Sequence, residues 1–103
     1  MKKYEIVVTD EAVADLENIY LYIATTLLSP EIASDQYNRI TSQILKLETM
    51  PERYCIIESE PDKSRGLRIM PVDNYSVLYI VDESTITVTN ILYSAYDMHE
   101  KLK

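Results

Sequence analysis

The sequence predicts an α+β domain in which a helical hairpin packs on one face of a four-stranded, mainly antiparallel sheet. Three observations lead to this prediction: a short opening strand, two long segments with helical spacing of apolar residues, and three alternating segments joined by polar turns. The predicted order is therefore β-α-α-β-β-β. With 103 residues, 47% of them hydrophobic, the chain is expected to form a single domain over residues 1–103.

The opening strand is predicted at residues 4–8, where side chains alternate as in a half-buried strand. Thr9 is expected to cap the first helix, with Asp10 and Glu11 in the first turn, where the helix dipole favours acids. One apolar stripe then follows at helical spacing. Its members are Ala12, Leu16, Ile19, Tyr20, Ile23 and Leu27.

The second helix is marked by proline at both ends. Ser29 is the expected cap, Pro30 takes the first helical position, and Pro51 ends the helix. Two antiparallel helices of this kind must bury their stripes against each other and against a sheet. The stripe of the second helix consists of Ala33, Tyr37, Ile40, Ile44 and Leu47.

The second strand follows Gly66, the one glycine in the chain, which is expected to supply a backbone angle or a close approach that a side chain would forbid. Pro71 shortens this strand or confines it to an edge of the sheet. The third strand, residues 75–81, is apolar on both sides and is therefore expected to be central. Asp73-Asn74 forms the hairpin turn between these two strands.

The last strand changes its alternation partway along. Ile86 and Val88 fall on even positions, whereas Ile91 and Tyr93 fall on odd positions. A β-bulge near Thr89-Asn90 would reconcile the two halves of the strand.

Charge and composition narrow the classes of function. The net charge is −7, and the acids lie mostly on the two helices, whereas residues 53–70 are locally neutral to basic. No apolar run reaches the roughly 20 residues that span a bilayer, and the opening residues are too acidic for a signal peptide, so we expect a cytoplasmic protein. Cys55 is the only cysteine, which excludes an internal disulfide and paired metal-ligand motifs and is best interpreted as a packed or idle thiol. No cofactor is expected.

Several segments together resemble a known family. They are YEIVVTDEAVADLENIYLYI, GLRIMPV, YSVLYIV and ILYSAYD, in this order along nearly the whole chain. In order and spacing the chain resembles the RelE/ParE family of bacterial type II toxins. The resemblance implies a growth-inhibiting toxin whose partner is a cognate antitoxin protein that covers the helices and the open face of the sheet. It implies neither a membrane association nor a small-molecule substrate.

Arg68 is the candidate that the resemblance singles out. If Leu67 and Ile69 face the helices, Arg68 and Met70 face the opposite, open side of the sheet. In RNA-cleaving members of the family, this arginine position lies on the face that holds the scissile phosphate. A guanidinium there would stabilise the phosphorane formed when a ribose 2′-hydroxyl attacks the phosphorus. The alternative is that Arg68 pairs with an acid across the strands.

Other candidates surround this arginine in the resemblance. Tyr93 and Tyr96 can stack on a base or donate a proton, or they simply pack at a sheet edge. His99 lies where some RNA-cleaving relatives place a catalytic histidine, and otherwise it is an exposed tail residue. Lys63 and Arg65 can grip a nucleic-acid backbone or acids of a partner, or they belong to a solvated loop.

The choice of target rests on a missing feature. Family members often carry basic residues just after the last strand, and here the matching residues, 94–96, are Ser, Ala and Tyr. Together with the long helical hairpin and the net acidity, this favours a ParE-like inhibitor of DNA gyrase. The alternatives are a RelE-like ribosome-dependent mRNA endonuclease and a degenerate, non-toxic member that still binds an antitoxin.

Overall fold

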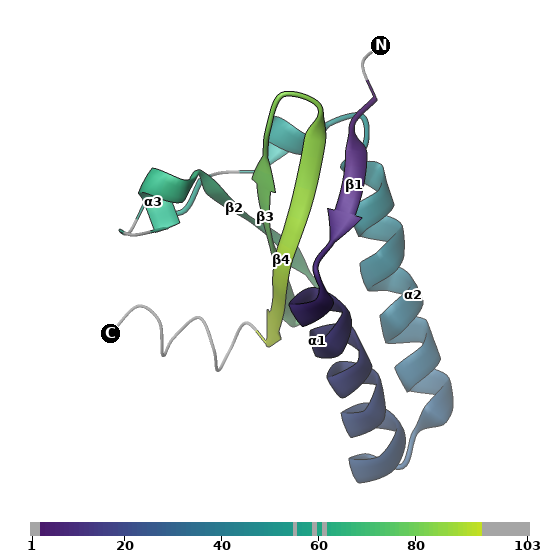
Figure 1. Cartoon of the computed structure of the whole chain (residues 1–103). Coiled ribbons are helices and arrows are strands. Elements are labelled where there is room, and N and C mark those ends of the chain that lie inside the picture. The colour runs from purple at the N-terminus through teal and green to yellow at the C-terminus, as the bar shows by residue number, and fades with distance from the viewer. Residues whose placement is uncertain (1–2, 55, 59, 61, 94–103) are drawn as a thin grey trace.

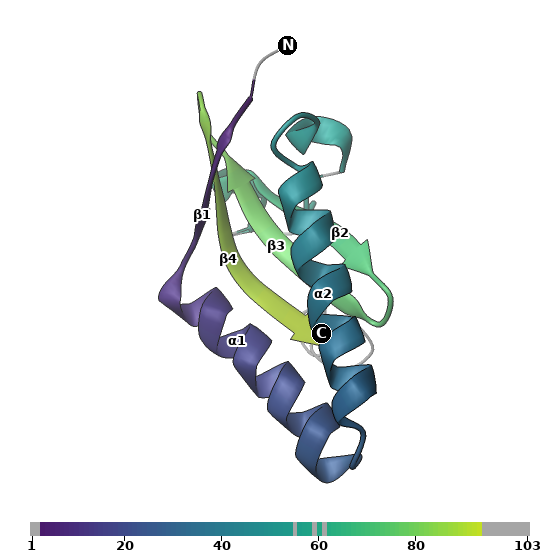
Figure 2. The ribbon, with the colours of Figure 1, turned by 90° about the vertical axis from the view of Figure 1, so that its right-hand side faces the viewer.

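A helical hairpin covers one face of a four-stranded sheet (Figures 1 and 2). The structure, a computed structural model, describes residues 3–54, 56–58, 60 and 62–93. It confirms the predicted α+β class and the β-α-α-β-β-β order, and it adds short helical turns between these elements. In order they are β1 (Glu5–Val8), α1 (Asp10–Leu21), a π-helical turn (Tyr22–Thr26), α2 (Pro30–Lys46), a 3-10 turn (Pro51–Arg53), α3 (Asp62–Arg65), β2 (Leu67–Val72), β3 (Tyr75–Val81) and β4 (Thr85–Tyr93).

The strand order in the sheet is β1-β4-β3-β2. Strands β2, β3 and β4 form an antiparallel meander, whereas β1 pairs with β4 in parallel, so the sheet is mixed. The position of β2 at an edge agrees with the proline within it, and β3 is an interior strand as predicted. The chain must cross from β1 to the far edge of the sheet, and α1 and α2 make this crossing over one face (Figure 2).

The predicted β-bulge is present in β4. Leu78 pairs with Asn90 and the next residue, Tyr79, pairs with Val88, so Thr89 is the extra residue. The bulge turns the rest of β4 so that odd-numbered residues face the helices. It therefore accounts for the change of alternation seen in the sequence.

Two turns have the backbone conformation that their residues favour. Gly66 has a φ of +70° and Asp73 a φ of +56°, both in the left-handed region. The Asp73 carboxylate also ties the β2–β3 turn to α2, because it accepts hydrogen bonds from Gln36 Nε2 at 3.0 Å and from Arg39 Nε at 2.8 Å. These bonds, that from Arg39 foremost, lower the pKa of Asp73 below its ordinary value of 3.8.

The hydrophobic core lies between the sheet and the two long helices. Thr9 caps α1 as predicted, because its hydroxyl accepts a hydrogen bond from the backbone N–H of Ala12 at 3.2 Å. The same hydroxyl donates to the carbonyl of Val88 at 3.0 Å, which attaches the start of α1 to β4. The buried core residues are Ala12, Leu16, Ile40, Ile44, Leu47, Met70, Val72, Val77, Tyr79, Ile86, Val88 and Ile91.

Two members of the predicted helical stripes are exposed instead of buried. Tyr37 is 39% exposed, and the neighbouring Gln36 takes the buried position because its amide bonds to Asp73. Leu27 is 56% exposed because the far end of the helical hairpin extends beyond the sheet (Figure 2). The stripe thus continues past the surface that it was expected to cover.

Candidate functional site

Arg68 lies on the face of the sheet that the helices cover, so the predicted orientation of this residue is wrong. In the strand register Arg68 pairs with Tyr79 and Met70 with Val77, and Met70, Val77 and Tyr79 are all core residues. The physical reason is that Met70 and Val72 supply the apolar side chains of β2 to the core, and alternation places Arg68 beside them. Leu67, on the other face, is also buried, with 1% of its surface exposed.

The guanidinium of Arg68 is held by the segment that follows α2. Its Nη1 donates to the carbonyl of Tyr54 at 2.5 Å, and its Nη2 lies 3.9 Å from a carboxylate oxygen of Glu52. Only 17% of the Arg68 side chain is exposed. Its partners are a backbone carbonyl and an acid of the 3-10 turn, not an acid across the strands. The phosphate-binding role predicted for Arg68 stays a prediction.

Tyr79 closes the same end of the core. Its buried hydroxyl donates to the carbonyl of Pro51 at 2.6 Å. Burial raises the pKa of Tyr79 to about 12, so the phenol keeps its proton and remains a donor. Tyr79 and Arg68 together attach residues 51–54 to the end of the sheet.

The structure does not bring the predicted site residues together. On β3, Tyr75 pairs with Tyr93 of β4, whereas Tyr79 pairs with Arg68 of β2. Tyr75 and Tyr79 are four residues apart, so Tyr93 and Arg68 are separated by roughly 13 Å along the strand direction. Lys63 is exposed on α3, with its Nζ 3.7 Å from a carboxylate oxygen of Glu58.

Arg65 is exposed on the same short helix as Lys63. Tyr96, His99 and Cys55 lie outside the described residues. The roles predicted for all of these residues remain predictions.

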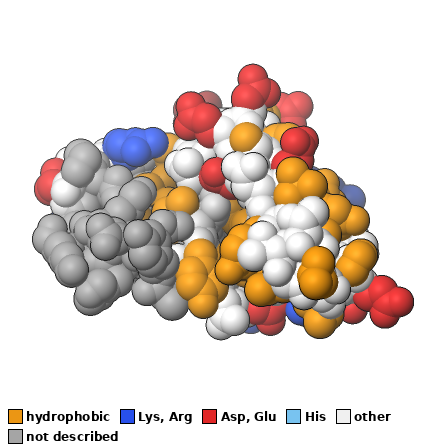
Figure 3. Space-filling model, turned by 90° about the horizontal axis from the view of Figure 1, so that it is seen from below, with side chains coloured by type: hydrophobic (Ala, Val, Ile, Leu, Met, Phe, Trp, Pro, Cys, Tyr) orange, Lys and Arg blue, Asp and Glu red, His pale blue; other side chains and the backbone are white. Residues whose placement is uncertain are grey.

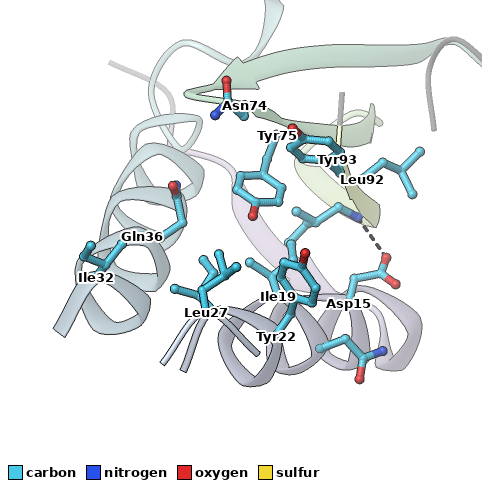
Figure 4. Close-up of a pocket in the computed structure, with 13 residues that line it drawn as sticks. Asp15, Ile19, Tyr22, Leu27, Ile32, Gln36, Asn74, Tyr75, Leu92 and Tyr93 are labelled. Carbon is cyan, nitrogen blue, oxygen red and sulfur yellow. Dashed lines mark hydrogen bonds between the residues drawn. The ribbon is translucent and has the colours of Figure 1, made fainter. Parts of the chain in front are cut away.

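A groove opens at the opposite end of the core, between the tip of the helical hairpin and the β2–β3 turn (Figure 4). We call it the hairpin-tip groove. Its volume is about 650 Å³. Figure 3 shows hydrophobic side chains gathered over this end of the molecule. The lining residues are Asp15, Asn18, Ile19, Tyr22, Ile23, Leu27, Ile32, Gln36, Asn74, Tyr75, Ile91, Leu92 and Tyr93.

The helical side of the groove exposes large apolar side chains. Tyr22, Leu27 and Ile32 each expose more than half of their surface. The chain turns there through the π-helical segment and through Leu28, which has a φ of +53° and is 81% exposed. A π-helical turn, a non-glycine residue in the left-handed region and a contiguous apolar surface are each features that concentrate at binding sites.

The strand side of the groove is formed by two tyrosines. Tyr75 and Tyr93 meet edge to face with ring centroids 5.6 Å apart, and Figure 4 shows the Tyr75 ring directed toward the helical side of the groove. Burial, and then the neighbouring phenols of Tyr93 and Tyr22, raises the pKa of Tyr75. Tyr75 therefore remains a neutral donor, and the wall offers apolar ring surface with a polar tip, a combination common at protein interfaces.

The carboxylate of Asp15 lies at the end of the groove beside the bulge of β4. It accepts hydrogen bonds from the backbone N–H of Ile91 at 2.9 Å and from Asn90 Nδ2 at 3.5 Å. These bonds secure β4 against α1 just after the bulge. Asp15 was not among the site residues predicted from the sequence, although an acid among the apolar positions of the first helix was a signal for it.

Sequence reasoning also missed the groove as a whole. The available signal was length: residues 10–26 form roughly 25 Å of helix at 1.5 Å per residue, and the paired strands at this end cover only part of that length. Among the described residues, no group of three or more His, Cys, Asp and Glu side chains is arranged to hold a metal ion. Within the described part of the chain, no helix combines the length and the apolarity needed to cross a membrane.

The arrangement of a helical hairpin on a four-stranded mixed sheet also occurs in solved structures from bacterial toxin–antitoxin systems. A chain of the chromosomal ParDE toxin–antitoxin system from P. aeruginosa superposes with a TM-score of 0.73 at 24% identity, over 88% of this chain and 96% of that one. A chain of the RelBE2 toxin–antitoxin complex from Mycobacterium tuberculosis superposes with a TM-score of 0.64 at 20% identity, over 90% of this chain and 93% of that one. A mutant of the E. coli toxin RelE in the free state superposes with a TM-score of 0.61 at 11% identity, over 95% of this chain and 92% of that one.

The family follows from the sequence itself. The profile of the family described as the ParE toxin of the type II toxin-antitoxin system, parDE, matches residues 6–98. The chain therefore belongs to the ParE toxin family, which confirms the resemblance found in the sequence. No curated protein matches the chain at a significant level.

Proposed function

We propose that this chain is the toxin of a ParDE-like pair, that its target is DNA gyrase, and that a cognate antitoxin neutralises it by binding the hairpin-tip groove. The position of Arg68 is the observation that carries the choice of target. A ribonuclease of this family needs an exposed cation where the phosphorane forms. Here the guanidinium is bonded to the carbonyl of Tyr54, beside the carboxylate of Glu52, with 17% of its side chain exposed.

Electrostatics supports a protein target in the same way. The net charge of −7 repels a phosphate backbone at long range, whereas a protein surface carries no such uniform charge. The apolar surface around Tyr22, Leu27 and Ile32 matches a protein partner better than a nucleic acid. The antitoxin is expected to be encoded by the adjacent gene and to carry its own DNA-binding fold.

Pulse labelling after induced expression tests the target. Loss of DNA synthesis with filamentation, while protein synthesis continues, is the expected result, and purified gyrase should then be inhibited by the purified chain. Rapid loss of protein synthesis would instead identify an mRNA endonuclease. Unaffected growth with intact antitoxin binding would identify a degenerate, non-toxic member of the family.

The mRNA endonuclease is the second candidate because of a specific feature. Tyr93 is 44% exposed at the rim of the groove, and Lys63 and Arg65 are exposed on α3. Under this alternative Tyr93, Tyr96 or His99 would supply proton transfer, and Arg68 would leave its present partners to bind the phosphate. Arg68→Ala should then abolish cleavage of ribosome-bound mRNA, whereas it should leave inhibition of gyrase unchanged.

A further inference from the structure

The hairpin-tip groove contains one fixed charge. Among the described residues that line it, Asp15 alone is ionic, and the others are aliphatic side chains, tyrosines and amides. A single carboxylate at the end of an apolar groove discriminates strongly between binding partners. A partner that covers it must either supply a cation to pair with it or bury the charge away from water, which is costly.

Among the residues that the structure describes, the carboxylate of Asp15 is held in place by hydrogen bonds and by no cation. Both of its hydrogen bonds, from the backbone N–H of Ile91 and from Asn90 Nδ2, end on Oδ2. No described residue donates to Oδ1, although a carboxylate accepts about four bonds in all. Figure 4 shows the bond to the backbone of β4 that fixes the direction of the group.

The surrounding charges favour a cationic partner. Between residues 10 and 50 there are seven acidic residues against Arg39 and Lys46, a net charge of −5. Of these two cations, Arg39 is already bonded to Asp73, at 2.8 Å. The field at the groove is therefore negative, and it attracts a positively charged segment.

From these observations we infer that the groove receives an amphipathic segment of the antitoxin whose apolar side chains cover Tyr22, Leu27 and Ile32 and whose single arginine or lysine pairs with Oδ1 of Asp15. This inference rests on the proposed function, because it names the chemistry of the partner at the same groove. Asp15 then determines specificity: a segment without the cation buries an unpaired carboxylate, which costs more than the lost attraction alone.

The test compares two substitutions that remove the same charge from the same helix. Asp15→Asn keeps an oxygen that accepts from Ile91 and removes the charge inside the groove. Glu11→Gln removes an exposed charge one turn away that does not line the groove. The affinity of the purified chain for the cognate antitoxin is measured by calorimetry at low and at physiological salt.

We expect Asp15→Asn to weaken binding by about 30-fold and to reduce its salt dependence, whereas Glu11→Gln changes the affinity by less than about twofold. Equal affinities of Asp15→Asn and the unaltered chain would overturn the inference. An equal loss with Glu11→Gln would overturn it as well, because the effect would then be one of long-range charge.

A double-mutant cycle identifies the cation and protects the test against misfolding of a variant. Each lysine and arginine of the antitoxin's toxin-binding segment is replaced by glutamine in turn. One replacement should weaken binding to the unaltered chain about 30-fold and have little further effect on Asp15→Asn. If no replacement couples to Asp15, the inference fails while antitoxin binding stands. If the unaltered chain does not bind the antitoxin at all, the proposed function itself fails.

Discussion

The two ends of the helix-covered face of the sheet differ in whether the core is closed. At one end buried polar groups are hydrogen-bonded, and at the other apolar side chains remain exposed. At the Arg68 end, the guanidinium and the Tyr79 hydroxyl are bonded to backbone carbonyls of residues 51–54, and the core is closed. At the Tyr93 end, the hairpin overhangs the sheet, and Tyr22 and Leu27 are exposed around an open groove. The difference teaches that a charged residue of a strand can be bonded within the fold at one end, while large apolar side chains stay exposed at the other.

The largest expected effect is at the open end. Leu27→Asp places a charge on the apolar surface of the groove and should weaken antitoxin binding by about 100-fold, or about 2.7 kcal/mol. Leu45→Asp is the matched control, because Leu45 is a similarly exposed leucine of α2 that does not line the groove. Equal losses for the two variants in a calorimetric titration would show that the groove is not the binding surface.

The next effect belongs to the closed end and should appear in stability. Arg68→Ala removes the donor to the carbonyl of Tyr54 and should lower the free energy of unfolding by about 2 kcal/mol, measured by urea denaturation. Arg53→Ala, which removes a cation 5.7 Å from the Tyr54 ring, should cost less than about 1 kcal/mol. Antitoxin affinity should stay unchanged in both variants, and a large loss of affinity for Arg68→Ala alone would contradict the division between the two ends.

A smaller effect is expected for the buried phenol. Tyr79→Phe leaves the carbonyl of Pro51 without its donor and should destabilise the fold by about 1–2 kcal/mol. Tyr37→Phe, at an exposed position where the ring packs against Tyr20, should change stability by less than about 0.5 kcal/mol. Thermal unfolding of the two variants side by side measures the difference, and equal melting temperatures would refute the structural role of the Tyr79 hydroxyl.

The smallest effect concerns the link between α2 and the β2–β3 turn. Because the pKa of Asp73 is lowered in the folded chain, its carboxylate contributes stability at pH values above 3.8 that is lost as the pH falls below that value. The pair with Arg39 is largely exposed to solvent, so we expect only a few tenths of a kcal/mol. Asp73→Asn should flatten the pH dependence of stability below pH 3.8, and an unchanged acid limb would assign it to other carboxylates.

Much of the fold followed from local chemistry in the sequence. Thr9 capped α1, Asp73 and Gly66 took left-handed angles, and the change of alternation in β4 marked the bulge at Thr89. Each of these features depends on residues close together in the chain, which is why pattern reasoning reached them.

The face of Arg68 did not follow, because β2 carries apolar residues on both sides and its charge was taken to point outward. The deciding facts were the packing of Met70 and Val72 in the core and the carbonyl of Tyr54 that accepts the guanidinium. The groove was missed for a related reason. A helical stripe reveals which residues are apolar but not where the sheet beneath them ends, and Leu27 lies beyond that limit.

The pairing of β1 with β4 has a consequence for synthesis on the ribosome. At one end of the groove Asp15 is bonded to the backbone of Ile91, 76 positions further along the chain, and β1 has no partner strand in the sheet until β4 has been made. Long-range pairings of this kind form late, after the intervening chain has been made. A nascent chain therefore has no assembled hairpin-tip groove until β4 has been translated, and under the proposed function a truncated product that lacks β4 should not bind the antitoxin.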